Sequence, residues 1–149
     1  MKKIVCGIAV LSAMVSMSST VQASDNKHMM PIAAAMAANG AQARLGDSVK
    51  FYFGDQPIPK ILQKLGSDTT SQKTNAFGKS AEKSCNWVFL SDMLLLQKRA
   101  KELGANAVIN ITSNYNNVEN SSATEFECHV GGIMAGVAFK AEFVNVVDK

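Results

Sequence analysis

Apolar side chains recur every three or four positions between Ser80 and Leu103, the spacing that places them on one face of an α-helix. Ser80 can cap the first turn, Glu82 suits the positive end of the helix dipole, and Gly104 can end the helix in a left-handed turn. We therefore expect one long amphipathic helix over residues 80–103. Its buried stripe consists of Cys85, Phe89, Met93, Leu96, Ala100 and Leu103.

Alternating apolar and polar residues predict strands on both sides of this helix. Residues 48–53 and 124–130 alternate cleanly, residues 105–112 are almost continuously apolar, and a last strand follows Gly132. The positions expected to face inward are Val49, Phe51, Phe53, Thr124, Phe126, Cys128, Val130, Val137, Phe139, Ala141 and Phe143.

The remaining segments carry weaker signals. Residues 31–39 contain strong helix formers between Pro31 and Gly40, so we expect a short helix there. Residues 60–66 follow two prolines and fit either an edge strand or one helical turn. We expect a polar start and two polar loops over residues 24–27, 67–79 and 113–122.

Together these elements predict an α+β fold of two layers, in which the long helix packs on one face of a small antiparallel sheet. We expect residues 24–47 to form an N-terminal segment that contains the short helix. We expect residues 48–149 to form the α+β domain.

Residues 1–23 have the pattern of a secretory signal peptide. Lys2 and Lys3 give a basic start, an uncharged apolar run follows, and Val21-Gln22-Ala23 places small residues where a signal peptidase reads them. The run is broken by serines and is too short for a membrane anchor, which needs roughly 20 strongly apolar residues. We expect cleavage between Ala23 and Ser24, export to the periplasm, and no membrane anchor after cleavage.

Removal of this segment changes both the charge and the cysteine content. The formal charge of the whole chain is +3, and the loss of Lys2 and Lys3 leaves about +1, which gives no electrostatic reason to bind nucleic acid. Cys6 is also removed, so Cys85 and Cys128 remain. Two cysteines on inward faces, in an oxidising compartment, predict a Cys85–Cys128 disulfide.

The sequence lacks the common catalytic patterns. Gly78-Lys79-Ser80 is not preceded by the glycine that a phosphate-binding loop requires, and no Gly-x-Ser-x-Gly turn occurs. We therefore expect no enzyme activity and no cofactor.

One weak cation site is compatible with the pattern of residues 124–130. Glu125, Glu127 and His129 alternate along this strand and are expected to face outward together. Carboxylate and imidazole groups bind divalent cations, but such a row is also typical of a solvated strand face. The His-Met-Met tract at 28–30 offers soft metal ligands, or else it is a flexible start whose methionines pack on the domain.

Five stretches of the chain resemble a group of small exported proteobacterial proteins that are often labelled "excinuclease ATPase subunit". The resemblance implies an exported protein without an established function. The ATPase label has no counterpart in this chain, because the chain lacks a nucleotide-binding loop. The five stretches are KFYFGDQ (50–56), KTNAFGK (73–79), CNWVFLS (85–91), GANAVI (104–109) and SATEFECH (122–129).

Residues 90–143 show a looser resemblance to the YbjQ-like "heavy-metal-binding" domain and to the outer-membrane lipoprotein sensor of the Rcs envelope-stress phosphorelay. In that sensor a cysteine before the helix is bonded to one on a later strand, and Cys85 and Cys128 match these positions. The chain differs from the sensor in lacking a lipid-bearing cysteine and a second disulfide. Export, a small rigid domain and the lack of a catalytic pattern lead us to expect a non-enzymatic binding or interaction domain of the envelope, with a role in envelope-stress sensing and an unknown envelope protein as its partner. The alternative is a cation-binding or heavy-metal-binding protein.

Overall fold

The long predicted helix lies at the centre of the structure. In the computed structural model, which describes residues 25–147, helix α3 spans Ala81–Leu103. Ser80 caps this helix, because its hydroxyl oxygen accepts a hydrogen bond from a backbone N–H of the first turn at 3.1 Å. Gly104 ends it with a φ of 73°. The predicted helix and both of its ends are confirmed.

The sheet consists of six strands, which are β1 (Asn26–Pro31), β2 (Lys50–Phe53), β3 (Ile61–Asn75), β4 (Ala107–Ser113), β5 (Glu125–Val130) and β6 (Met134–Val146). β6 is the central strand: β3 pairs with it along its whole length, and β4 and β5 pair with it on the other side. β1 extends the sheet beyond β5, and β2 extends it beyond β4. Every pair is antiparallel except β2–β4, which is parallel.

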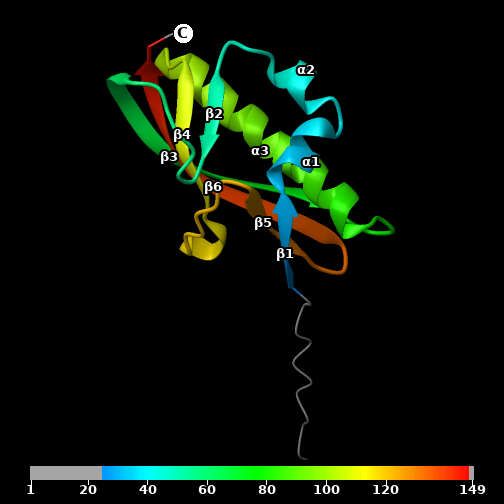
Figure 1. Cartoon of the computed structure of the whole chain (residues 1–149). Coiled ribbons are helices and arrows are strands. Elements are labelled where there is room, and N and C mark those ends of the chain that lie inside the picture. Colours follow the sequence, from blue (N-terminus) through cyan, green and yellow to red (C-terminus); the bar gives the residue numbers. More distant parts are fainter. Residues whose placement is uncertain (1–24, 148–149) are drawn as a thin grey trace, which may run out of the picture.

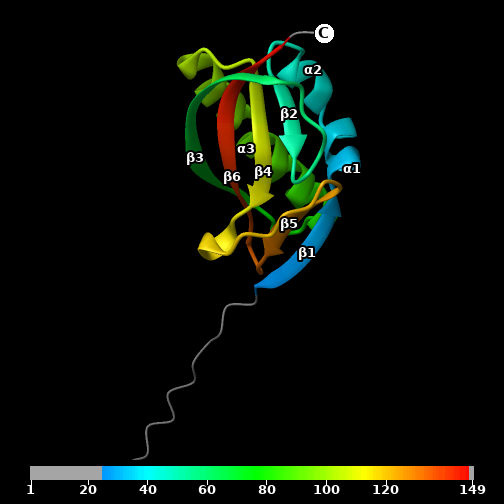
Figure 2. The same cartoon turned by 60° about the vertical axis from the view of Figure 1, so that its left-hand side comes forward.

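Figures 1 and 2 show the sheet curling around α3, while two short helices cover α3 on the side away from β3. The short helices are α1 (Ile32–Ala37) and α2 (Ala41–Leu45). The predicted fold class is confirmed, with the parallel β2–β4 pair as the one departure from an antiparallel sheet. None of the helices in the described part of the chain is long and apolar enough to cross a membrane.

The main hydrophobic core fills the space between α3 and the concave face of the sheet. Four phenylalanine rings meet there, with Phe89 of α3 only 4.6 Å from Phe126 of β5 and 5.9 Å from Phe139 of β6, measured between ring centroids. Phe53 of β2 stacks on Phe89 at 6.0 Å. Such contacts stabilise the core beyond the burial of apolar area. The predicted inward positions of β2, β5 and β6 supply three of these rings.

Residues 67–79, expected to form a loop, belong largely to strand β3, and this prediction is wrong. Of the two structures expected for residues 60–66, an edge strand or one helical turn, the edge strand is present, because β3 begins at Ile61. Polar residues are tolerated in β3 because it pairs only with β6 among the described strands, and alternate side chains along it are exposed. Pairing with the apolar strand β6 gives β3 its extended conformation. Charged residues on the open edge of β3 discourage pairing with another chain.

The N-terminal segment also differs from expectation. The helix predicted over residues 31–39 ends at Ala37, because Asn39 and Gly40 turn the chain with φ values of 55° and 65° into the unpredicted helix α2. Asn26 and Lys27 of the expected polar start belong to strand β1, which pairs with β5. Apolar residues of α1 and α2 lie in the same core as those of residues 48–147. The expected cleavage point between Ala23 and Ser24 lies outside the described residues.

Candidate functional site

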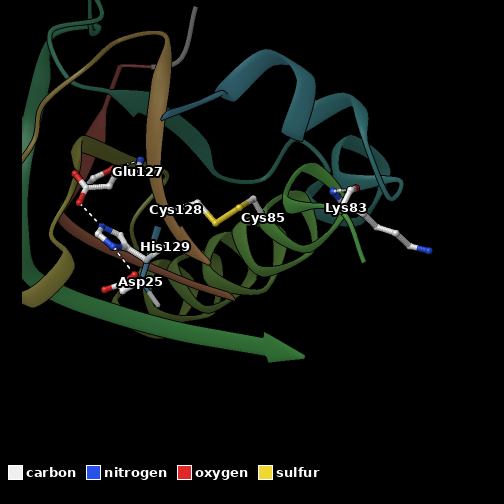
Figure 3. Close-up of a disulfide and its surroundings, with 8 residues drawn as sticks. Asp25, Lys83, Cys85, Glu127, Cys128 and His129 are labelled. Carbon is white, nitrogen blue, oxygen red and sulfur yellow. Dashed lines mark hydrogen bonds and ion pairs between the residues drawn. A yellow bond between two sulfur atoms is a disulfide. The ribbon is translucent and has the colours of Figure 1, made fainter. Parts of the chain in front are cut away.

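The predicted disulfide between Cys85 and Cys128 is present, with its sulfur atoms 2.04 Å apart. It joins the first turns of α3 to the middle of β5 (Figure 3), and both side chains have no exposed surface. The bond therefore anchors the strand that carries the predicted outward row, Glu125, Glu127 and His129, to the central helix.

His129 lies on the other face of β5 from Cys128 and contacts two carboxylates (Figure 3). Its Nδ1 atom is 2.9 Å from Asp25, which precedes β1, and its Nε2 atom is 2.6 Å from Glu127. Only the doubly protonated imidazolium can donate to both acceptors at once. The Tyr115 ring, after β4, stacks on the imidazole with centroids 3.6 Å apart and an angle of 4° between the planes.

Glu127 is buried, with 6 % of its surface exposed, rather than lying on a solvated face. The end of β4 and the segment after it contact Glu127: the Glu127 N–H donates to the hydroxyl of Ser113, the last residue of β4, at 2.8 Å, and the Asn120 amide donates to the Glu127 carboxylate at 3.2 Å. The Lys27 ammonium of β1 lies 3.0 Å from the same carboxylate. We call Asp25, Lys27, Tyr115, Asn120, Glu127 and His129 the His129 cluster.

Hydrogen bonds determine the pKa of the Glu127 carboxyl. Burial alone would raise the pKa of this carboxyl, but hydrogen bonds from His129, Lys27 and Asn120 outweigh burial and hold its pKa below the ordinary value. The pKa of Tyr115 is raised by burial and by the Asp25 carboxylate, so its hydroxyl stays protonated. The cluster thus brings the carboxyl groups of Asp25 and Glu127 together with the His129 imidazole and the Lys27 ammonium group.

This geometry ties β1 and the segment after β4 to β5. Both ring nitrogens face carboxylates, while Glu125 is exposed opposite Pro31. Among residues 25–147, no group of three or more His, Cys, Asp or Glu side chains could hold a metal ion. The cation site at Glu125, Glu127 and His129 stays a prediction that the arrangement of these side chains does not favour.

Replacing Glu127 by glutamine is expected to lower the free energy of unfolding at pH 7 by about 2 kcal/mol, since it removes the charge that accepts three hydrogen bonds. A carboxyl whose pKa is lowered by folding stabilises above its ordinary pKa and loses that contribution as the pH falls. The loss of unfolding free energy caused by Glu127→Gln should therefore be smaller at pH 3 than at pH 7. Urea unfolding measures it, with Glu125→Gln as the exposed control on the same strand; equal effects of the two substitutions would contradict the role of the cluster.

A groove between β2 and the two short helices was not expected from the sequence. Its cavity has a volume of about 630 Å³, within the range of small-molecule sites, about 300–1,000 Å³. Its apolar walls come from Ile32, Met36, Leu45, Val49, Phe51 and Phe53. The alternation at residues 48–53 signalled an apolar strand face, but the opposing wall depends on α2, which the sequence did not indicate.

Comparison with known proteins adds no relative: no protein-family model, no curated protein and no solved structure matches this chain.

Proposed function

We propose that this protein is an exported, non-enzymatic interaction domain that binds an extended segment of an envelope protein along the open edge of β2. The observation that carries the proposal is the groove described above, where a free strand edge borders a cavity lined by both apolar and polar residues. An extended segment can bind such a site by adding a strand to the sheet and placing alternate side chains in the cavity.

The backbone of β2 supports this mode of binding. The Lys50 N–H donates to the Asn106 carbonyl at 2.9 Å, and the Gly54 N–H donates to the Ile111 carbonyl at 3.0 Å, so the even positions face β4. Because backbone groups alternate along a strand, those of Phe51 and Phe53 point to the open edge. The Phe53 N–H donates to the Gln56 side chain at 2.8 Å. The groups of Phe51 are therefore placed to pair with an incoming strand.

The side chains of the groove indicate the chemistry of the partner segment. Phe51 is half-buried in the main core, and buried Ile32, Leu45 and Val49 form the floor around it. A segment with apolar residues at alternate positions would cover this surface, and its remaining side chains would face solvent. Gln42 and Lys50 at the rim can bond to polar groups of the partner.

Export is supported by the signal-peptide pattern of residues 1–23 and by the buried disulfide, which is compatible with an oxidising compartment. An interaction role is favoured over catalysis because the most elaborate polar cluster, around His129, has its ring nitrogens facing carboxylates. Intact mass of the protein recovered from the periplasmic fraction should begin at Ser24 if the proposal is correct.

The groove is tested by a photoreactive amino acid at Gln42, on the rim, in cells that export the protein. We expect a reproducible cross-linked adduct that Ala43→Arg reduces by roughly tenfold or more, because the long charged side chain fills the groove. Ala34→Arg is the matched control: it places the same side chain on an exposed position of α1 outside the groove. An adduct that survives Ala43→Arg, or that Ala34→Arg reduces equally, would rule out the groove as the binding site.

A further inference from the structure

Two turns of the chain lie side by side at one end of the molecule and carry exposed apolar side chains. One turn joins β3 to α3 over residues 76–80, and the other joins β5 to β6 over residues 131–133 (Figure 1). The Ala76 N–H donates to the Ile133 carbonyl at 2.8 Å, which holds the two turns together. The exposed side chains are Phe77, Ile133 and Met134, with 73 %, 63 % and 41 % of their surface exposed.

Trp87, on the second turn of α3, adds a fourth exposed apolar side chain beside these turns, with 48 % of its surface exposed. It lines a small hollow together with Asn75, and Asn75 pairs with Met134 in the register of β3 and β6. Single exposed apolar residues are ordinary on a protein surface, but several that gather in one place indicate an interaction surface. We call Phe77, Trp87, Ile133 and Met134 the tip patch.

Basic side chains surround the tip patch. Lys79 and Lys83 line the same hollow as Trp87. The Arg44 guanidinium lies 5.9 Å from the centroid of the Trp87 ring, and Lys73 is exposed near the end of β3. The apolar side chains are therefore bordered by cations that come from α2, β3, the β3–α3 turn and α3.

Acidic side chains do not balance this charge. Of the described residues, Glu82 lies exposed in the first turn of α3, and Asp25 lies near the β5–β6 turn but faces His129. The chain without residues 1–23 carries a formal charge of only about +1, so its positive charge is concentrated at this end. Two copies that met through the tip patch would bring these cations together, which disfavours self-association.

We propose that the tip patch docks the protein reversibly on a membrane surface that contains anionic lipid. Phe77 and Ile133 enter the boundary between headgroups and acyl chains, Trp87 lies at the level of the headgroups, and the basic side chains contact lipid phosphates. A bilayer fits this surface better than a folded protein does, because side chains that protrude from two turns can enter lipid without a complementary surface. The proposal rests on export but not on the β2 groove, so either binding site can fail without the other.

Trp87 is the only tryptophan in the chain, so its fluorescence reports on docking. Protein purified from the periplasmic fraction is titrated with vesicles of equal parts phosphatidylglycerol and phosphatidylcholine, and with vesicles of phosphatidylcholine alone. We expect a saturable blue shift with the mixed vesicles, a much weaker one without phosphatidylglycerol, and weaker binding as the salt concentration rises. Co-flotation with the vesicles measures binding without reference to Trp87.

Substitutions separate the apolar and the basic contributions. Phe77→Ser combined with Ile133→Ser should weaken binding to the mixed vesicles at least tenfold, because both side chains lose their apolar contact with lipid. Lys83→Gln should weaken it about fivefold. The matched controls are Leu62→Ser and Lys64→Gln, which change exposed residues at the opposite end of β3 and should leave binding unchanged.

Two results would overturn the proposal. One is the absence of saturable binding to the mixed vesicles; a protein adduct formed in cells by a photoreactive amino acid at position 77 would then assign the tip patch to a protein partner. The other is equal weakening by the substitutions in the tip patch and by the controls at the far end of β3, because the patch would then not be the docking surface.

Discussion

Replacing Cys85 and Cys128 together by alanine should lower the free energy of unfolding by about 4 kcal/mol in oxidising buffer. The bond closes a loop with a sequence separation of 43 residues, and its loss restores that conformational freedom to the unfolded chain. Since domains are typically stable by about 5–15 kcal/mol, the loss is a large share of the total. The melting temperature should fall by roughly 10–20 °C, which circular dichroism measures.

Reductant supplies the control for this substitution. The parent protein should melt near the temperature of the double variant once its disulfide is reduced, whereas the double variant should not respond to reductant. A melting temperature unchanged by both treatments would show that the bond contributes little to stability.

Replacing Asp92 by asparagine should stabilise the protein at pH 8, and the gain should vanish in acid. Asp92 lies in the middle of α3 with no exposed surface, and neither carboxylate oxygen has a hydrogen-bond partner among the described residues. Burial raises the pKa of this carboxyl from 3.8 to about 7. The folded protein therefore holds a proton that the unfolded chain has already lost.

The pH dependence follows from this difference in proton binding. The contribution of Asp92 to stability is fully present below about pH 3.8, falls as the pH rises, and is lost above about pH 7. The advantage of Asp92→Asn over the parent should accordingly grow by on the order of 4 kcal/mol between pH 4 and pH 8. Urea unfolding at the two pH values measures it, with exposed Asp55→Asn as the control. An advantage that is the same at both pH values would show that Asp92 is not a protonated buried acid.

The sequence predicted the elements whose signals are local. The buried face of α3 and the inward-facing side of β5 each follow from the spacing of a few neighbouring residues. Both faces carry a cysteine, and Cys85 and Cys128 are bonded in the structure. β3 was missed because its own residues are polar and its conformation depends on β6, whose paired residues lie 59 to 85 positions further along the chain. A pattern within residues 67–75 cannot report that partner.

The candidate sites were harder to predict than the fold. Alternation placed Glu127 and His129 on the face of β5 opposite Cys128, as observed, but it could not show that Asn120 and Lys27 would cover Glu127. The groove requires elements from separate parts of the chain.

The central place of β6 also determines when the domain can form. β3, β4 and β5 all pair with this strand, which is the last one in the described chain. A chain made from its N-terminus onward therefore holds three strands without their main partner until residues 134–146 emerge. Long-range pairing of this kind delays folding. A domain built in this way remains unfolded through most of its synthesis, which is the condition in which a polypeptide can be threaded through a narrow secretion channel.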